Sequence, residues 1–198
     1  ATAAAPGAPV SWADAAQWCW LGGIAAVAAV LIASNVRFGR QLKRSARPRA
    51  VADCPLPVYV AEGLPSPCLY GVFRPAIYLT PESLGDERRL RYILAHELTH
   101  YAHRDHLWAL ARGACLAVYW FNPLVWMAAA LSARDAELAC DEGALRRLGD
   151  GHRVEYGRTL IAMMATRSGP LDLLRGATTM AAGRGGMRER IALIASRP

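Results

Sequence analysis

The sequence has few cysteines, and their number and spacing exclude a disulfide framework as the basis of the fold. Five cysteines are present, an odd number, and Cys19 lies within a long apolar stretch. Small domains that depend on disulfides carry even sets of cysteines at higher density. We therefore expect free thiols in a reducing compartment.

Charged residues are absent from Ala15 to Val36. A helix of this length, at about 1.5 Å per residue, crosses roughly the 30 Å hydrocarbon core of a bilayer. The sequence therefore predicts a transmembrane helix over 15–36, with a helix buried in a soluble domain as the alternative. Residues 1–14 are expected to form a short non-cytoplasmic segment, whose start lacks the basic residues of a signal peptide.

Acidic residues are absent from the segment that follows, which holds six basic residues between Arg37 and Arg49. Without these six, the 23 basic residues fall to 17, against 16 acidic residues in the whole chain. No general basic surface remains, so we expect no direct nucleic-acid partner. Because basic residues favour the cytoplasmic side, we predict a basic juxtamembrane linker at 37–54 and a cytoplasmic domain at 55–198. The chain is thus expected in the cell membrane, in contact with its lipids.

The stretch His-Glu-Leu-Thr-His at 96–100 falls in a segment expected to be helical. Histidines four residues apart lie on one helix face, so His96 and His100 can bind one ion while Glu97 faces the water that the ion activates. Imidazole nitrogens suit Zn2+, and three protein ligands with an open fourth position are typical of a hydrolytic zinc site. We predict Zn2+ as the cofactor and Glu97 as the catalytic base. The alternative is a chance motif on a helix surface.

Two further histidines raise a competing ligand pattern. In the metzincin pattern the third ligand lies six residues after the second histidine, where His106 stands, and follows a glycine that turns the chain. His103 occupies that glycine position here, and a β-carbon disfavours the turn. We therefore expect His103 and His106 to be surface or helix-end residues, and Asp105 to be the N-cap of a new helix.

A second uncharged stretch runs from Gly113 to Leu131. A complete membrane crossing here would place the acidic candidates for a third ligand on the side opposite the histidine pair. Asn122-Pro123 predicts a helix start instead, and two arms of equal length would return Glu137 to the level of Asp105. We predict an antiparallel helical hairpin at 106–136, either re-entrant or interfacial in the membrane or buried in a soluble core.

Acidic residues follow on the second arm of this hairpin. Glu137 and Asp141 lie four residues apart and hence on one helix face. We assign Glu137 as the third metal ligand and Asp141 as the acceptor of a hydrogen bond from the far nitrogen of a ligand histidine. Arg134, one turn earlier, is expected to hold either carboxylate. His152 and Tyr156 are candidate oxyanion donors, with ordinary packing as the alternative.

An alternating apolar pattern between Pro55 and Thr80 predicts short β-strands joined by turns. A small sheet before the motif helix could accept an extended peptide along an edge strand, for which Tyr78 and its neighbours are candidates. Asp86 is expected to cap the motif helix. The predicted fold class is α+β: a mainly helical domain with a small β-sheet, preceded by a transmembrane helix.

Segments spread from Val58 to Ile194 match one pattern of motifs. They are His96–His100, Arg104-Asp105, Trp120–Trp126 and Glu137–Glu142, with Gly71–Leu79 upstream and Tyr156–Leu160 and Arg188–Ile191 downstream. Together they resemble the membrane-embedded zinc metallopeptidases of the β-lactam sensor and antirepressor type. The resemblance implies a gluzincin-like domain in which His96, His100 and Glu137 bind Zn2+ and Glu97 is catalytic.

The same resemblance implies a role in antibiotic-resistance signalling. The chain would be a membrane-anchored zinc endopeptidase that cleaves a transcriptional repressor, itself or both, and so induces genes. Self-cleavage or a homodimer would make a second copy of the chain a partner. Two alternatives stay open: a non-catalytic signalling module stabilised by zinc, and a housekeeping membrane protease of the prenyl-protein type.

Overall fold

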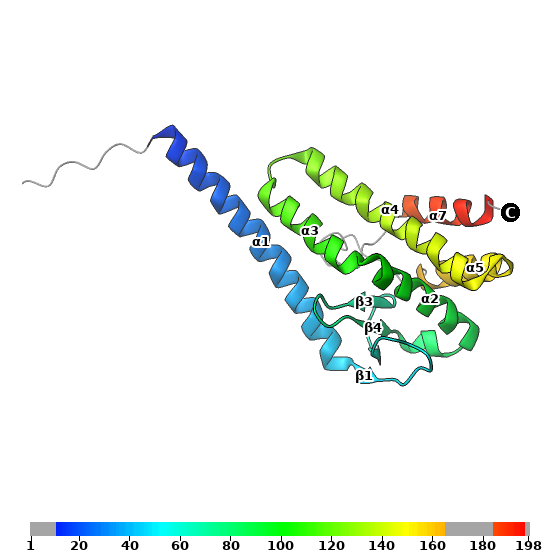
Figure 1. Cartoon of the computed structure of the whole chain (residues 1–198). Coiled ribbons are helices and arrows are strands. Elements are labelled where there is room, and N and C mark those ends of the chain that lie inside the picture. Colours follow the sequence, from blue (N-terminus) through cyan, green and yellow to red (C-terminus); the bar gives the residue numbers. More distant parts are fainter. Residues whose placement is uncertain (1–10, 165–183, 197–198) are drawn as a thin grey trace, which may run out of the picture.

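The computed structural model describes residues 11–164 and 184–196, and this part of the chain is mainly helical with one small sheet (Figure 1). Its α-helices are α1 (Trp12–Ser45), α2 (Glu87–His103), α3 (Asp105–Val118), α4 (Pro123–Leu148), α5 (Arg153–Met164) and α7 (Arg184–Ser196). Its strands are β1 (Arg47–Pro48), β2 (Val58–Val60), β3 (Cys68–Tyr70) and β4 (Ala76–Leu79), with 3-10 turns η1 (Pro81–Leu84) and η2 (Asp150–His152). The prediction of a mainly helical chain with a small sheet and an apolar first helix is confirmed. The prediction for residues 1–10 lies outside the described residues.

The four strands form a mixed sheet in the order β1-β2-β4-β3. β2 and β4 run parallel with Val58 opposite Ile77, whereas β1 and β3 are antiparallel edge strands. The prediction that Tyr78 lies on an open edge is wrong, because β4 inserts between β2 and β3. The turn from β3 to β4 starts at Gly71, whose φ of 114° favours glycine, and it folds β4 back along β3.

Helix α1 is longer than the predicted span. It begins behind a capping box formed by Ser11 and Asp14 and continues through the first basic residues to Ser45. The residues expected to start a linker are therefore helical, because the end of α1 packs on the sheet. Leu42 is buried there, and a Cβ on Gly39 would lie 2.2 Å from the Tyr70 hydroxyl. By length and composition, α1 is the one described helix able to cross a membrane.

The middle of α1 lies alongside α3 (Figure 1). Helix α1 also approaches the turn that follows α3 closely at Gly23, where a Cβ would lie 2.1 Å from the indole ring of Trp120. The indole N–H of Trp20 donates to the carbonyl of Val118 at 2.9 Å, and that of Trp120 donates to the carbonyl of Trp20 at 3.3 Å. Small residues and aromatic hydrogen bonds thus join α1 to the rest of the molecule.

Helices α3 and α4 form the predicted antiparallel hairpin. The side chain of Asn122 caps α4 by accepting from Leu124 N at 2.9 Å, with Pro123 as the first helical residue. Helix α3 ends at Val118. Large apolar side chains of the hairpin are exposed, namely Leu107, Trp108, Leu110, Tyr119, Phe121, Leu124, Trp126, Met127 and Leu131. The hairpin is therefore not the buried core of the described structure.

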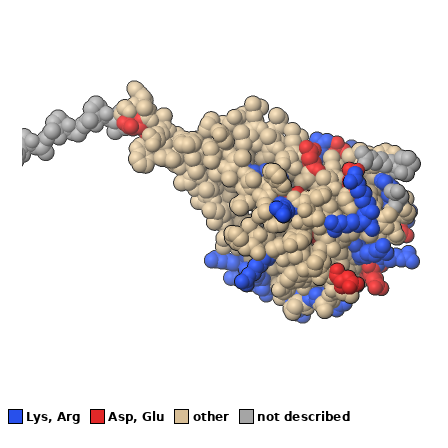
Figure 2. Space-filling model, viewed as in Figure 1, with Lys and Arg blue, Asp and Glu red and all other residues tan. Residues whose placement is uncertain are grey.

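The far end of the molecule holds α2 between the sheet and a second helical layer. Ile93 packs with Ile77 of the sheet, whereas Tyr92 packs on the other side with residues of α4, α5 and α7. Tyr156 and Ile194 belong to that second cluster, so two segments far apart in sequence cover the same face of α2 and α4. Figure 2 shows that charged side chains gather at this end, while the visible surface of most of α1 is uncharged. 

Candidate metal centre

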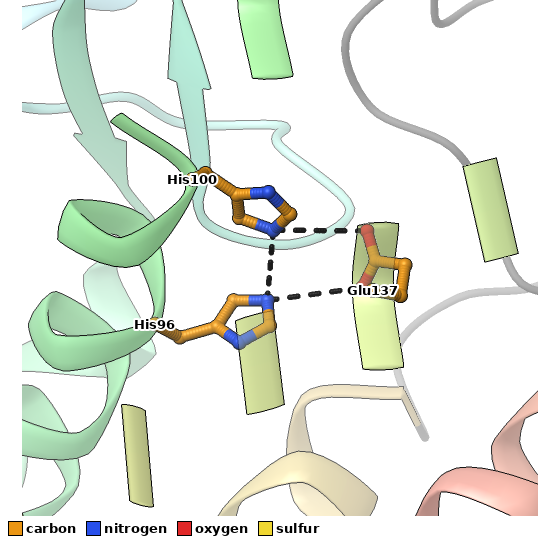
Figure 3. A group of neighbouring side chains, drawn as sticks. All are labelled: His96, His100 and Glu137. Carbon is orange, nitrogen blue, oxygen red and sulfur yellow. Dashed lines mark hydrogen bonds and ion pairs between the residues drawn. The ribbon is translucent and has the colours of Figure 1, made fainter. Parts of the chain in front are cut away.

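The two histidines of the motif lie on the face of α2 that points toward α4 (Figure 3). Asp86 caps the helix as predicted, accepting from Arg88 N at 2.9 Å. The Nε2 atoms of His96 and His100 are 3.0 Å apart, as expected for side chains one helical turn apart. His96 is buried, and its ring meets that of His100 edge-on.

Glu137 of α4 completes a group of three. Its two carboxylate oxygens each lie 3.7 Å from one Nε2 atom, Oε2 from His96 and Oε1 from His100 (Figure 3). Ligand atoms about 2.0–2.1 Å from a tetrahedral Zn2+ are separated from each other by about 3.3 Å. The separations in this group bracket that value, so the three side chains fit a metal ion of this kind.

The far nitrogens of both rings meet acceptors. His96 Nδ1 lies 2.9 Å from the hydroxyl of Tyr156 and 3.3 Å from Oδ1 of Asp141, and that hydroxyl donates to Asp141 at 2.8 Å. His100 Nδ1 donates to Oδ2 of Asp105 at 2.7 Å. With the protons on Nδ1, both Nε2 lone pairs face Glu137 and are free to bind a metal. Asp141 thus lies beside His96, as the sequence expected, but the hydrogen bond of His96 Nδ1 goes to the Tyr156 hydroxyl, which in turn donates to Asp141.

Asp105 was expected to be an N-cap, and that prediction is wrong. Asp105 is the first residue of α3, while the preceding Arg104 adopts a left-handed conformation with φ 58°. This conformation turns α3 away from α2 and brings the Asp105 carboxylate back to His100. Burial opposes the charged form, yet hydrogen bonds from His100 and Cys140 lower the pKa of Asp105. The only sign of this contact in the sequence is the short spacing between His100 and Asp105.

The charge around His100 favours its protonated form in the metal-free protein. Burial acts against that form, but the hydrogen bond to Asp105 and the charges of Glu137 and Glu97 raise the pKa of His100 to about 9. Glu97 itself is buried, and no hydrogen bond joins it to another side chain in the described part of the chain. Its carboxylate is therefore available at the site.

A second group of metal-ligand types includes His100, Asp105 and Cys140. The 2.7 Å between His100 Nδ1 and Asp105 Oδ2 is a hydrogen-bond distance and is short for two ligands of one Zn2+. The Cys140 thiol donates to Asp105 at 3.2 Å, and burial raises its pKa, so it is a weak ligand as a neutral thiol. We therefore interpret Asp105 and Cys140 as residues that hold the His100 ring in place, and not as ligands of a separate metal site.

Other predicted roles are not met by the geometry. Arg134 holds neither Glu137 nor Asp141: its Nε donates to Glu189 of α7 at 2.6 Å, because its side chain points along the outer face of α4. The carboxylates are held instead by Arg190 of α7, which sequence reasoning missed. Only the resemblance of the segment Arg188–Ile191 hinted at that residue.

Neither candidate oxyanion donor is placed for that role. The hydroxyl of Tyr156 lies on the Nδ1 side of His96, away from the facing Nε2 atoms, and it is engaged by Asp141. His152 Nδ1 lies 3.0 Å from the hydroxyl of Tyr92, which also donates to Glu155. Tyr156 therefore supports His96 from its Nδ1 side, and His152 pairs with Tyr92 of α2.

The competing histidines also lie outside the group. His106 stacks on Tyr101 with ring centroids 6.1 Å apart, and among the described residues it joins no cluster of metal-ligand types. His106 lies at a helix end, in the first turn of α3, and is buried there, whereas His103 is exposed at the end of α2. The geometry thus favours Glu137 over His106 as third ligand.

Comparison with known families decides which metal-binding proteins this chain is related to. The BlaR1 peptidase M56 family matches residues 4–194. The chain belongs to this family. The BlaR1 peptidase M56 family consists of metallopeptidases, so membership implies a peptidase that uses a metal, and it confirms the resemblance drawn from the motifs.

Curated relatives are similar over a shorter stretch. The regulatory protein BlaR1 of Bacillus licheniformis is 31% identical over 110 residues, which are 55% of this chain and 18% of that protein. Methicillin resistance mecR1 proteins of Staphylococcus aureus and Staphylococcus epidermidis are 23% identical over 111 residues, 54% of this chain and 19% of theirs. The chain thus matches less than a fifth of these relatives' length. They support a membrane signalling family connected with antibiotic resistance.

Proposed function

We propose that this protein is a membrane-anchored zinc endopeptidase with a gluzincin-like site. His96, His100 and Glu137 are the Zn2+ ligands, and Glu97 is the general base. The observation that carries the proposal is the convergence of two Nε2 atoms and one carboxylate, with separations of 3.0 and 3.7 Å, beside a buried glutamate on the same helix. Three ligands leave one position open, as hydrolysis requires.

The chemistry is amide hydrolysis. Bound zinc would polarise the scissile carbonyl and lower the pKa of a water molecule from 15.7 toward about 7. Glu97 takes the proton of the attacking water and passes it to the leaving amine, so the base is regenerated. Asp105 and Asp141 hold the histidine rings with their Nδ1 atoms protonated, which keeps the Nε2 lone pairs directed at the site.

The proposed topology follows from the surface of the molecule. We propose that helix α1 crosses the membrane with its C-terminal end in the cytoplasm, a direction that the six basic residues between Arg37 and Arg49 favour. The metallopeptidase domain, 55–198, is then cytoplasmic, and residues 1–14 are not. The exposed apolar side chains of the α3–α4 hairpin support contact of 106–136 with the bilayer at or below its interface.

The substrate we propose is a cytoplasmic transcriptional repressor, this chain itself, or both. The support is that the relatives are named as a regulatory protein and as methicillin resistance proteins. A buried glutamate beside the ligand group favours this function over a zinc-stabilised module without activity, since a structural site would use a fourth protein ligand. Among the described residues, the group has three members.

The experiment compares the full chain, purified in detergent, with Glu97→Gln and with Glu87→Gln. Glu87 is exposed in the first turn of the same helix, so its variant loses the same charge away from the site. Zinc per chain is measured together with cleavage of the chain itself, of casein and of a prenylated peptide. We expect Glu97→Gln to keep its zinc and to lose cleavage by about 100-fold or more, with Glu87→Gln unchanged.

Other outcomes would favour other functions. Zinc bound by all three proteins with no cleavage by any of them would favour the non-catalytic module. Selective cleavage of the prenylated peptide would favour the housekeeping protease. Absence of zinc from the wild-type chain would contradict the proposed site.

A further inference from the structure

A buried guanidinium from the C-terminal helix contacts the candidate metal centre. Arg190 of α7 is 4% exposed, and it lies 49 residues beyond Asp141 in the sequence. We propose that Arg190 is a positioning residue of the metal centre, which makes α7 a required part of the catalytic unit. This inference rests on the proposed zinc peptidase function and names the residue that arranges its acidic side chains.

The contacts use both edges of the guanidinium. Its Nε donates to Oδ2 of Asp141 at 2.6 Å and its Nη2 donates to Oδ1 at 2.8 Å, which is a bidentate pair. Its Nη1 lies 2.8 Å from Oε2 of Glu137. A single planar group therefore binds the carboxylate of the proposed ligand Glu137 and, at the same time, the carboxylate of Asp141 behind His96.

These contacts reduce the repulsion between two buried carboxylates of the site. Glu137 and Asp141 are one helical turn apart on α4, and both are poorly accessible to water, with side chains 15% and 5% exposed. Two buried like charges at this spacing repel and would turn outward. Arg190 offsets one of these two negative charges and fixes the rotamers of both side chains, with Oε1 of Glu137 left toward His100.

The position of Arg190 depends on the docking of α7. Ile194 of the same helix packs in the core cluster with Tyr156 and Leu160, and Glu189 pairs with Arg134 on the outer face of α4. Docking of α7 therefore brings a cation to Glu137 and Asp141 at the same time. The Tyr156 hydroxyl, held by Asp141, extends this effect to His96.

Variants of Arg190 can separate the effect of its charge from the effect of its hydrogen-bond geometry. Arg190→Gln removes the charge, whereas Arg190→Lys keeps it but offers a compact ammonium that cannot hold Asp141 bidentately and reach Glu137. Arg188→Gln is the matched control, because Arg188 is exposed on the same helix. Zinc affinity is measured by chelator competition, the coordination by the absorption spectrum of the Co2+ form, and activity as kcat and KM for casein. Thermal unfolding reports whether α7 stays folded onto the domain.

We expect Arg190→Gln to weaken zinc binding by roughly tenfold or more, to alter the Co2+ spectrum and to lower kcat more than KM. Arg190→Lys should recover stability more than it recovers zinc affinity, and Arg188→Gln should match the wild type. If Arg190→Lys folds and retains the zinc affinity and Co2+ spectrum of the wild type, the inference is wrong. That result differs from failure of the proposed function, in which the wild type itself lacks zinc or Glu97→Gln still cleaves.

Discussion

His100 is surrounded by more negative charge than an isolated imidazole meets, and this has a measurable effect on metal binding. Its pKa in the metal-free protein is about 9, above the ordinary 6.5. The protonated ring therefore contributes stability that is fully present below pH 6.5 and is lost as the pH rises through 9. A metal needs the neutral ring, so zinc has to displace this proton at neutral pH.

We predict that zinc binding at pH 7 releases about one proton from His100, and that this release disappears near pH 10. Calorimetric titration with zinc in buffers of different ionisation enthalpy measures the number of protons. Asp105→Asn removes the strongest support for the protonated ring and should reduce the release at pH 7. Equal proton release by both proteins at pH 7 would contradict the assigned role of Asp105.

The sequence predicts those site residues that lie close together in the chain. It misses the site residues whose role depends on tertiary structure. Helical periodicity is enough to bring His96 and His100 together. Asp105 could not be assigned, because its direction depends on the left-handed conformation of Arg104. Arg190 could not be assigned either, since only the packing of α7 brings it to α4.

Two neighbouring glycines in α1 can test its contact with the turn between α3 and α4. A Cβ on Gly23 would lie 2.1 Å from Trp120, whereas a Cβ on Gly22 would have no neighbour within 4 Å. Gly23→Leu should therefore force α1 away from Trp120 in the turn after α3, at a cost of about 1–3 kcal/mol typical of overpacking. Gly22→Leu introduces the same side chain with open space around it.

Thermal unfolding in detergent checks this prediction, because both variants gain the same helix propensity and their difference isolates the contact. We expect a lower midpoint for Gly23→Leu only. Equal midpoints would show that α1 does not pack on Trp120 at this position.

Helix boundaries could be predicted from the sequence because capping residues determine them. The strand order of the sheet could not, because it depends on which strands pair. Asn122-Pro123 specified the hairpin and Asp86 specified the start of α2. The strand order could not be derived, because an alternating pattern fixes which face of a strand is apolar and says nothing about its neighbour. Tyr78 was therefore placed on an edge although β4 lies inside the sheet.

For the molecule as a whole, the distribution of tryptophan offers a direct test of membrane contact. All 6 tryptophans lie in α1 or next to or within the α3–α4 hairpin, and Trp108 is 61% exposed. With Trp108 as the single tryptophan and the others changed to Phe, we predict quenching by lipids brominated in their acyl chains. A control with Phe73→Trp in place of all native tryptophans probes the sheet, where Phe73 is 97% exposed.

The control should be quenched by aqueous acrylamide and not by brominated lipid. Quenching of Trp108 by acrylamide alone would place the hairpin in water and contradict the proposed topology. Composition indicated a membrane protein from the sequence, but only the structure shows that the apolar side chains of the hairpin point outward.

The most direct test of the central claim is X-ray absorption at the zinc edge of the purified chain. The proposed site predicts two imidazole nitrogens and further oxygen ligands at about 2.0–2.2 Å, from His96, His100, Glu137 and a water, with no sulfur. A sulfur shell at about 2.3 Å would instead place the metal at Cys140, with His100 and Asp105, and contradict the assignment.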